Sequence, residues 1–416
     1  MQEVHPFYLS GTLQMPASKS VMQRALLLSA FADGQSILQH TTWSNDALAC
    51  HDAIQYLGAT TEKLEQQVLI KGLQNYPEQA ALNLGESGLA FRMFTGFLAC
   101  IPGKFQLSAK GSLLKRPLKP IIDSLSSLGI QAKDEYPFTI HGAEPKKEIS
   151  LDGSFSSQFI TGVIIALATK SDEHILRLQD PKSLPYIQLS LEMIQSFGAQ
   201  VRELGNHTYA IIGKKNLSAQ NIELEADWSA ASNFIVAAAL RGKIELKGLL
   251  PTSAQADKAI IELLDNAGAS YVLNEGHFKI EEQQLPAFDF DAEHCPDLFP
   301  ALVLLAAGIK GSSRIQGTNR LIHKESNRLE ALMQNFGKQG LQITQEENAF
   351  IIRGTGSLNA AKLDSFNDHR MAMIAAMSAT LCKSKVQIIQ PNSVAKSYPE
   401  FYKDLKLASK AIKQLY

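Results

Sequence analysis

Two kinds of helix alternate along the chain, and they differ in how their hydrophobic residues are distributed. The first kind is amphipathic: apolar residues recur at helical spacing, as at Ile121, Leu125 and Leu128, which predicts one buried face. The second kind is apolar on all sides, and a helix without a polar face is expected at the centre of a domain. There are six such segments: Ser18–Phe31, Gly88–Cys100, Ser156–Ala168, Ser229–Leu240, Asp297–Ala307 and Asp368–Leu381.

Glycines end the amphipathic helices at a regular interval. They recur about every 70 residues, at Gly58, Gly129, Gly198, Gly268 and Gly337. Glycine adopts the left-handed conformation that ends a helix without steric cost, so each is predicted to be a helix stop. Each repeat therefore has a strand, a buried helix, a strand, an outer helix and further strands. A chain of 416 residues holds about six repeats, with the sixth outer helix after Pro399.

Six repeats predict two α/β domains of three repeats each, with apolar helices inside and strands outside. The polar segment Asn216–Glu225 follows the third repeat, so we place one crossing between domains near Leu224. A second crossing near Pro16 would return the first strand to the second half. The expected domains are residues 16–224 and residues 1–15 plus 225–416.

Composition and charge narrow the classes of function. Hydrophobic residues make up 45% and charged residues 19% of the chain, as in ordinary globular proteins. The net charge of −1 and the absence of a Lys/Arg block disfavour a nucleic-acid partner. No apolar run approaches the roughly 20 residues that span a bilayer, and the N-terminus lacks a secretory pattern, so we expect a cytoplasmic protein. Four cysteines without metal-site spacing predict reduced thiols.

Cations and short polar side chains gather where the apolar helices begin. Helix N-termini attract anions because their N–H groups are unpaired and carry partial positive charge. Arg92 and Arg370 each enter an apolar helix, where an unpaired guanidinium is costly. The cationic candidates are Lys19, Arg24, Arg92, Arg116, Lys324, Arg328, Arg370 and Lys396. If these helix starts converge, they predict a site for a small polyanion, with Asp297 and Glu325 as candidates for proton transfer.

Simpler interpretations of the same residues stay open. Lys19 and Arg24 could lie at a solvated helix start, Asp368 and Arg370 could form a local pair, and one serine of Ser156-Ser157 could be an N-cap. The phosphate-loop, dinucleotide, zinc-protease and serine-hydrolase motifs do not occur in the sequence, which removes the usual support for those activities.

Seven motifs in order carry a resemblance to a known family. They are Pro16-Ala17-Ser18-Lys19-Ser20 with Arg24, Gly153-Ser154-Phe155-Ser156-Ser157-Gln158-Phe159, Pro185-Tyr186-Ile187, Ala226-Asp227-Trp228-Ser229-Ala230-Ala231-Ser232, Pro296-Asp297, Lys324-Glu325-Ser326-Asn327-Arg328 and Asn367-Asp368-His369-Arg370-Met371-Ala372-Met373. With these, the chain resembles the 5-enolpyruvylshikimate-3-phosphate (EPSP) synthase family over essentially its whole length.

The resemblance implies a fold and a reaction. The fold is two inverse α/β domains, each pseudo-threefold and built from βαβαββ repeats, with an interdomain active-site cleft. The reaction transfers the enolpyruvyl group of phosphoenolpyruvate to the 5-hydroxyl of shikimate 3-phosphate and releases phosphate, a step of the shikimate pathway toward chorismate and the aromatic amino acids. No metal and no organic cofactor are implied. The expected partners are the two small substrates, without nucleic acid or membrane, and the chain is expected to be a monomer.

The resemblance also implies roles for individual residues. The first domain would be the shikimate 3-phosphate side and the second would hold much of the phosphoenolpyruvate. Shikimate 3-phosphate would contact Lys19, Ser20, Arg24, Ser156, Ser157, Ser183, Tyr186, Asp297 and Lys324. Phosphoenolpyruvate would contact Lys19, Gly88, Arg116, Gln158, Arg328, Arg370 and Lys396. Lys19, Asp297 and Glu325 would be catalytic, and further site candidates are Asp46, Glu86, Arg92, Asp368 and His369. Two phosphates and two carboxylates carry about −5 to −6 charges, comparable to the eight cations.

One segment departs from the family pattern. Where Asn-Ala-Gly-Thr or Asn-Ser-Gly-Thr is usual near phosphoenolpyruvate, this chain has Glu86-Ser87-Gly88-Leu89. The change adds a carboxylate and removes a hydroxyl. Our hypothesis is that this loop weakens the binding of glyphosate, expected to share the phosphoenolpyruvate site, more than it weakens turnover.

Three other functions are weighed against this one. A UDP-N-acetylglucosamine enolpyruvyl transferase is disfavoured because its typical Lys-Asn-Ala start is absent. A catalytically weak homologue that only binds polyanions is suggested by Glu86, but such a protein would not need Asp297 and Glu325. A nucleic-acid-binding module lacks both the basic excess and the surface aromatics.

Overall fold

The computed structural model describes residues 1–73, 75–214 and 217–411 and divides the chain into two compact units. The continuous unit is Ala17–Leu224, and the discontinuous unit is Met1–Pro16 with Glu225–Tyr416. Residues 412–416 of the expected second domain lie outside the described residues. Among the described residues, no helix is both long and apolar enough to cross a membrane.

The predicted apolar segments form the central helices of each unit. In the continuous unit these are α1 (Lys19–Ala30), α3 (Gly88–Ala99) and α5 (Ser157–Ala168). In the discontinuous unit they are α7 (Trp228–Leu240), α9 (Phe299–Gly308) and α11 (His369–Met377). Short 3-10 helices flank two of them, η3 (Pro296–Leu298) before α9 and η5 (Ser378–Leu381) after α11. The prediction of buried central helices is confirmed, because every residue of α3 and α11 is buried.

The amphipathic segments form the outer helices α2 (Asn45–Leu57), α4 (Lys119–Ser127), α6 (Leu184–Ser196), α8 (Ile260–Asn266), α10 (Arg328–Lys338) and α12 (Phe401–Ala408). Gly58, Gly129, Gly198 and Gly268 follow their helices with φ of 114°, 82°, 98° and 69°, which confirms four predicted stops. The fifth prediction is wrong: α10 continues through Gly337, and Gly340, with φ of 82°, lies just beyond the helix end. Gly337 lies within the helix, at a position where the space around a Cβ is open.

Three sheets surround the central helices of the continuous unit. The first contains β10 (Glu148–Asp152), β11 (Glu173–Gln179), β13 (Thr208–Ile212) and β12 (Gln200–Gly205). The second contains β15 (Asn221–Glu223), β4 (Gln35–Gln39), β6 (Gln67–Lys71) and β5 (Thr60–Lys63). The third contains β7 (Gln79–Asn83), β8 (Gly103–Ser108) and β9 (Phe138–Gly142). A short ladder joins β3 (Ala32–Asp33) to β14 (Leu217–Ser218).

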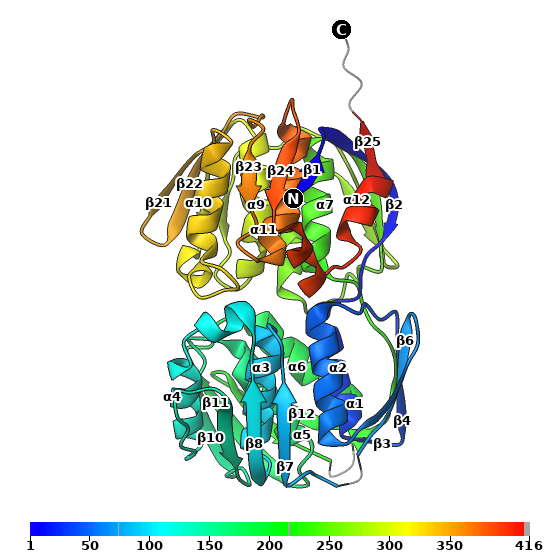
Figure 1. The fold of residues 1–416 in the computed structure, drawn as a ribbon, viewed down its shortest axis with the longest axis vertical. Helices are drawn as coiled ribbons and strands as arrows, with labels where there is room; N and C mark the ends of the chain where they lie inside the picture. The colour runs from blue at the N-terminus through cyan, green and yellow to red at the C-terminus, as the bar shows by residue number, and fades with distance from the viewer. Residues whose placement is uncertain (74, 215–216, 412–416) are drawn as a thin grey trace. The chain divides into compact units, whose positions relative to one another are not determined.

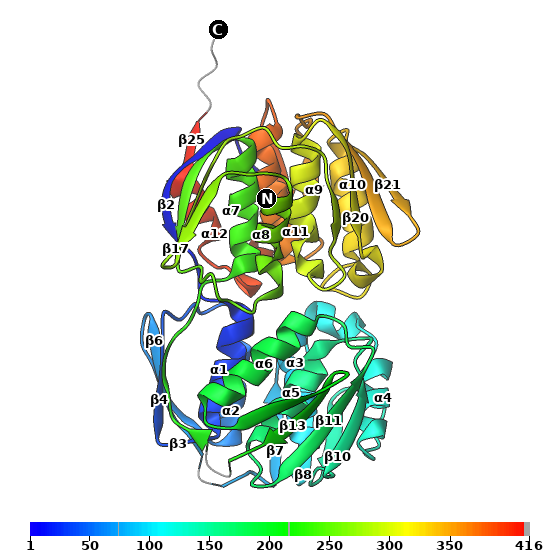
Figure 2. The same cartoon turned by 180° about the vertical axis from the view of Figure 1, so that it is seen from behind.

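The discontinuous unit repeats this plan. Its sheets are β17 (Tyr271–Asn274), β18 (His277–Glu281), β16 (Gly242–Lys247), β2 (Phe7–Gln14) and β25 (Ser409–Ala411); β19 (Asp289–Asp291), β20 (Gly311–Gln316), β22 (Ala349–Gly354) and β21 (Gln342–Glu346); and β1 (Gln2–Val4), β24 (Val386–Ile389) and β23 (Lys362–Asp364). Within this unit, α7, α9 and α11 lie between the sheet of β21 and β22 and the sheet of β2 and β25 (Figures 1 and 2).

In the described part of the chain, the six sheets of three or more strands share one arrangement. Each contains a parallel pair, and the second strand of that pair is antiparallel to a third strand, as in β19, β20 and β22. In four sheets an apolar helix connects the parallel strands directly, as α9 connects β19 and β20. In the other two, the first strand comes from a distant segment: β15 pairs with β4, and β2 pairs with β16. Helix N-termini in such units lie at the carboxyl edge of the strands, which is where ligands bind in α/β folds.

Candidate active site

Arg328 is the centre of an ion-pair cluster in the discontinuous unit. Its guanidinium is fully buried at the start of α10. Nε donates to Asp368 Oδ2 at 2.7 Å and Nη2 to Asp368 Oδ1 at 3.3 Å, while Nη1 donates to Asp297 Oδ1 at 2.6 Å. Nη2 also pairs with Glu325. Three carboxylates therefore surround one cation, and their charges raise the pKa of Arg328 although burial opposes this.

Asp297 joins this cluster to two more cations. Arg370 Nη2 donates to Asp297 Oδ2 at 3.0 Å, and Lys324 Nζ lies 3.2 Å from Asp297 Oδ1. The Asp297 side chain keeps 22% of its surface exposed. Burial acts to raise the pKa of Asp297, but Arg370, Lys324 and Arg328 outweigh it and hold the pKa well below the usual range. Asp297 is thus a carboxylate at neutral pH. It becomes able to accept a proton when Arg370, Lys324 and Arg328 interact with another anion and lower its pKa less strongly.

Asp257 is a member of the cluster that the sequence did not single out. It lies in the 3-10 turn η2 (Ala256–Ala259), and its side chain is 1% exposed. Its Oδ2 accepts the Ser229 hydroxyl and lies 3.9 Å from Arg370 Nη1. Burial raises the pKa of Asp257 to about 7, with Arg370 opposing and Asp297 adding to the shift. In the sequence, Asp257 is a single acidic residue at the end of the uncharged segment Ser253-Ala254-Gln255-Ala256. This pattern does not predict a site residue, and only the packing brings Asp257 to the cluster.

Asp368 organises the start of α11. Its Oδ1 accepts the backbone N–H of Arg370 at 2.9 Å, which makes it the N-cap, and its Oδ2 accepts the Ser326 hydroxyl at 3.1 Å. The local Asp368–Arg370 ion pair is therefore not formed: the Asp368 carboxylate binds Arg328, and the Arg370 guanidinium binds Asp297. The two side chains therefore bind different partners, although they are only two residues apart in sequence.

His369 and Lys396 lie beside this cap. The His369 ring is 1% exposed, with Nδ1 3.9 Å from Asp368 Oδ1. Lys396 ends the 3-10 turn η6 (Pro391–Lys396), is 6% exposed, and donates from Nζ to the Asn367 carbonyl at 2.6 Å. The loop before α11 thus brings together both candidates and the Asp368 cap.

In the continuous unit, Lys19 and Asp46 form a shielded ion pair. Lys19 is the first residue of α1, and Asp46 lies in the first turn of α2. Lys19 Nζ lies 3.0 Å from Asp46 Oδ2, with side chains 12% and 8% exposed. Ser18, one residue earlier, is the N-cap and accepts the Val21 N–H. The lysine is thus held at the helix start by a carboxylate from the neighbouring helix.

Arg24 is buried among uncharged partners. Nε donates to Ser190 Oγ at 2.9 Å, Nη2 to Thr161 Oγ1 at 3.1 Å, and Nη1 to the Ser20 carbonyl at 2.8 Å. With 1% exposure, Arg24 does not lie at a solvated helix start, so that interpretation is wrong for this residue. Burial lowers its pKa to about 10. The guanidinium also lies over the Tyr186 ring, with Cζ 5.8 Å from the centroid.

Arg92 and Arg116 gather at the start of α3. A Cβ on Gly88 would lie 2.2 Å from Arg116 Nη1 and 3.1 Å from Arg92 Nη1, so both guanidinium groups rest against this glycine. Arg92 Nη1 donates to Gln158 Oε1 at 3.0 Å. Two cations and the first residue of a helix whose N-cap is Ser87 form an arrangement suited to a carboxylate or phosphate.

The serine candidates lie at the starts of α5 and α6. Ser156 is the N-cap of α5 and accepts the Gln158 N–H at 3.2 Å, while Ser157 is the buried first residue of the helix. Ser183 precedes α6 with φ of 55° and does not cap it through its side chain, and Tyr186 lies in the first turn. Ser20 follows Lys19 in α1. The N-cap interpretation thus accounts for Ser156 alone.

Comparison with known proteins identifies the family. The sequence model described as EPSP synthase (3-phosphoshikimate 1-carboxyvinyltransferase) matches residues 5–405. This chain belongs to the EPSP synthase family. It is 31% identical over 405 residues to 3-phosphoshikimate 1-carboxyvinyltransferase of Methanocorpusculum labreanum, covering 96% of each chain. It is 33% identical to that of Pyrococcus abyssi, covering 95% of this chain and 94% of the relative. EPSP synthase from Acinetobacter baumannii has a similar structure, with TM-score 0.81, 25% identity and 99% coverage of both chains.

The fold of this EPSP synthase family member is the expected mixed α/β fold with repeated sheets and helices. Each unit brings its own candidates together. The discontinuous unit joins Asp297, Lys324, Glu325, Arg328, Asp368 and Arg370 in one cluster, and the continuous unit joins Lys19 to Asp46 and Arg92 to Gln158. In the described part of the chain, no group of three or more His, Cys, Asp or Glu side chains is arranged to hold a metal ion.

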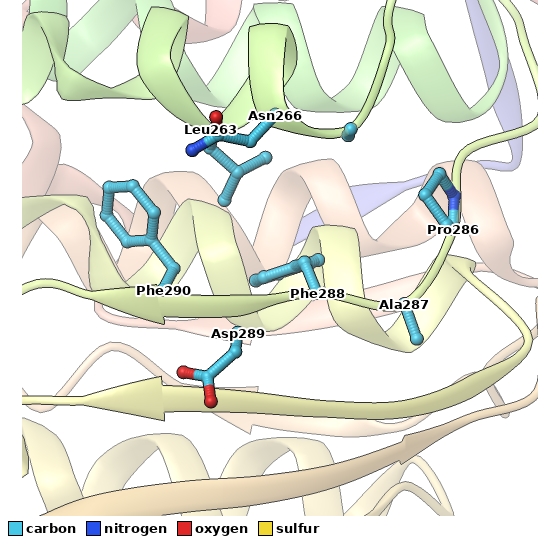
Figure 3. A pocket seen from close by; sticks show the side chains of 8 residues that line it. Leu263, Asn266, Pro286, Ala287, Phe288, Asp289 and Phe290 are labelled. Carbon is cyan, nitrogen blue, oxygen red and sulfur yellow. The ribbon is translucent and has the colours of Figure 1, made fainter.

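A cavity elsewhere in the discontinuous unit is unrelated to these residues. It measures about 220 Å³ and lies between the end of α8 and β19 (Figure 3). Leu263, Phe288 and Phe290 give it an apolar lining, to which Asn266 adds polar atoms, while the carboxylate of Asp289 points away from α8 (Figure 3). None of the predicted site residues lines it.

Proposed function

We propose that this chain transfers the enolpyruvyl group of phosphoenolpyruvate to the 5-hydroxyl of shikimate 3-phosphate, using the residues of the two clusters described above. The products are 5-enolpyruvylshikimate 3-phosphate and phosphate. The observation that carries the proposal is the Asp297 carboxylate, which is held ionised by Arg328, Arg370 and Lys324. A base surrounded by cations suits a reaction in which a hydroxyl loses its proton beside two anionic substrates.

We assign shikimate 3-phosphate to hydroxyl and cationic side chains. Short hydroxyl side chains at helix starts, together with lysines, suit a phosphate monoester. The Arg24 guanidinium is already enclosed by Ser190, Thr161 and Ser20, so we assign it to orienting Tyr186 and the ring of the substrate. The proposed ligands are Lys19, Ser20, Arg24, Ser156, Ser157, Ser183, Tyr186, Asp297 and Lys324.

We assign phosphoenolpyruvate to the part of the site that contains most of the arginines. A planar guanidinium offers paired N–H donors that match carboxylate and phosphate oxygens. Arg116 and Gly88 lie together at the start of α3, and Arg92 holds Gln158 beside them. The proposed ligands are Lys19, Gly88, Arg116, Gln158, Arg328, Arg370 and Lys396.

Proton transfers accompany both the addition step and the elimination step. Asp297 accepts the proton of the 5-hydroxyl as its oxygen bonds to C2 of phosphoenolpyruvate, and Glu325 with Lys19 supplies a proton to C3. The bond between C2 and the phosphate oxygen of the tetrahedral adduct then breaks: the leaving phosphate takes the proton held by Asp297, and a proton of the methyl carbon returns to Glu325 with Lys19, which restores the enol ether. Each proton taken up by the enzyme in one step is returned in another, so the residues are regenerated.

The ion pairs of the cluster give substrate binding an electrostatic role. Arg328 and Arg370 are paired with protein carboxylates, so an arriving phosphate or carboxylate shares these cations. Sharing weakens the field that holds the pKa of Asp297 low, and a higher pKa makes this carboxylate a better base. Binding of the anionic substrate thus prepares the base for its proton.

Phosphate release by the purified protein tests the proposal. We expect turnover with phosphoenolpyruvate and shikimate 3-phosphate, none with UDP-N-acetylglucosamine, and a loss of about 100-fold or more in Glu325→Ala, as expected for removal of an acid–base group. Glu330→Ala is the matched control, because Glu330 lies in the first turn of α10, the helix that Glu325 precedes, and has an exposed side chain.

The other outcomes separate the alternatives. Turnover with UDP-N-acetylglucosamine would identify the related transferase. Binding of shikimate 3-phosphate without turnover by a folded protein would identify a binding homologue. Cytoplasmic location and a monomeric state are part of the proposal, and cell fractionation and light scattering test them.

A further inference from the structure

The turn before α3 and the loop after β8 are joined by backbone hydrogen bonds. β7 and β8 are parallel neighbours, so both segments leave the same edge of the sheet. The Leu84 N–H donates to the Ser108 carbonyl at 3.0 Å, and the Lys110 N–H donates to the Gly85 carbonyl at 2.7 Å. Residues 84–87 and 108–112 therefore lie side by side.

Glu86 adds a side-chain contact to this junction. Its Oε2 accepts the backbone N–H of Ser112 at 2.9 Å and the Ser112 hydroxyl at 3.0 Å. Gly111 has φ of 53°, and a Cβ there would lie 2.4 Å from the carboxyl carbon of Glu86. The carboxylate thus packs on bare backbone, and only glycine at 111 leaves room for this Glu86–Ser112 contact.

Arg116 follows the segment that Glu86 holds. Residues Gly111–Lys115 form the 3-10 turn η1. Leu113 of this turn is buried, and its carbonyl accepts the Arg116 N–H at 3.1 Å. The Arg116 guanidinium then lies against Gly88, two residues after Glu86. One short, hydrogen-bonded turn therefore connects the Glu86–Ser112 contact to the arginine at the start of α3.

We propose that Glu86 is a positioning residue for phosphoenolpyruvate: it holds the Gly111–Lys115 turn so that the Arg116 guanidinium stays beside Gly88. The inference rests on the proposed function, which assigns Arg116 to that substrate. One side-chain oxygen accepts both the N–H and the hydroxyl of Ser112, and these two hydrogen bonds fix the position of the turn. The carboxylate acts through Arg116 and does not need to touch the substrate.

Steady-state kinetics of the full chain test the inference. In Glu86→Ala we expect the KM for phosphoenolpyruvate to rise roughly tenfold, about 1.4 kcal/mol, while the KM for shikimate 3-phosphate stays within about twofold. Glu86→Gln should restore the wild-type KM, because its amide oxygen accepts the same two donors. Glu144→Ala is the control, since it removes an exposed glutamate that binds Lys170 elsewhere in the same unit.

A double-variant comparison asks whether Glu86 acts through Arg116. Arg116→Ala alone removes the guanidinium, so adding Glu86→Ala should change the KM for phosphoenolpyruvate little further. Multiplied effects would overturn the inference, as would an equal rise of both KM values in Glu86→Ala. Failure of Glu86→Gln to restore the KM would also overturn it, because charge rather than anchoring would then be the property that matters.

Amide hydrogen exchange gives a readout that does not depend on activity. Exchange of the Ser112 amide should accelerate in Glu86→Ala and stay slow in Glu86→Gln and in Arg116→Ala. Unchanged exchange in Glu86→Ala would overturn the anchoring role even in an active enzyme. If the variants show the expected exchange but the wild-type protein does not turn over the two substrates, the proposed function is contradicted. The Glu86–Ser112 contact would still be established in that case.

Discussion

At the scale of single residues, Asp257 shows how burial changes chemistry. The carboxyl group lies among Arg370, Asp297 and Ser229, and burial raises its pKa from 3.8 to about 7. The folded protein therefore binds this proton more tightly than the unfolded chain does. The resulting stabilisation is fully present below pH of about 4 and is lost as the pH rises through about 7.

Asp257→Asn tests this assignment. Relative to wild type, the free energy of unfolding of the variant should rise by about 2 kcal/mol between pH 5 and pH 8, because the wild type alone must ionise a buried acid. Urea unfolding at several pH values measures it. Asp265→Asn, which removes an exposed carboxylate from α8, is the control. A difference that stays flat or falls with rising pH would show that Asp257 is ionised throughout.

Glu86 and Leu89 also carry the hypothesis on glyphosate. Glu86→Gln with Leu89→Thr removes the charge and restores a hydroxyl, while the glutamine still reaches Ser112. We expect glyphosate inhibition to tighten about fivefold, as one fewer negative charge near an anionic ligand implies, with the KM for phosphoenolpyruvate changed less. Inhibition assays at fixed shikimate 3-phosphate measure both. Glyphosate inhibition equally tight in wild type would refute the hypothesis.

At the scale of elements, two helical glycines show two different effects on stability. One lies at a close helix–helix contact, and the other has open space around it. α3 and α5 approach so closely that a Cβ on Gly162 would lie 2.0 Å from the Met93 carbonyl oxygen. A Cβ on Gly337, in the outer helix α10, would meet no atom within 4 Å apart from those of its own chain neighbours and helix backbone. The first glycine is required by the contact between central helices, whereas the second only costs backbone entropy.

Alanine at these positions should therefore shift stability in opposite directions. Gly162→Ala should lower the free energy of unfolding by about 3 kcal/mol, because two backbones must separate. Gly337→Ala should raise it by about 0.5–1 kcal/mol, because alanine is the better helix former. Urea unfolding followed by circular dichroism measures both. A loss of stability in Gly337→Ala would mean that α10 does not continue through this position.

At the scale of the whole molecule, the proposed division of substrates between the units can be measured by hydrogen exchange on the full chain. Shikimate 3-phosphate alone should protect the starts of α5 and α6 most strongly, since Ser156, Ser157, Ser183 and Tyr186 are its proposed ligands. Adding phosphoenolpyruvate should extend protection to the starts of α10 and α11. The β21–β22 hairpin serves as an internal control. Stronger protection of α10 than of α5 by shikimate 3-phosphate alone would contradict the division.

The sequence by itself determined the repeat and the central helices, and it supplied the candidate residues of the site. Hydrophobic periodicity and glycine stops act over a few residues, so they can be read from the chain without knowing what lies nearby in space. Gly337 marks the limit of this approach: its spacing fits a stop, but the apolar face of α10 continues, and the helix ends before Gly340 instead. The family motifs similarly identified the cations without identifying their partners.

Only the tertiary structure decided which groups meet. Arg328 pairs with Asp297 and Asp368, which are 31 and 40 residues away, and Arg24 is enclosed by neutral donors and acceptors from two other helices. β15 joins β4 across more than 180 residues of chain. Such pairings depend on how helices and strands pack, and a buried ion pair or a buried acid arises only where packing removes water from the charged groups. Local sequence patterns indicate which residues are candidates for the site, whereas packing decides which partners they meet and which of them are ionised.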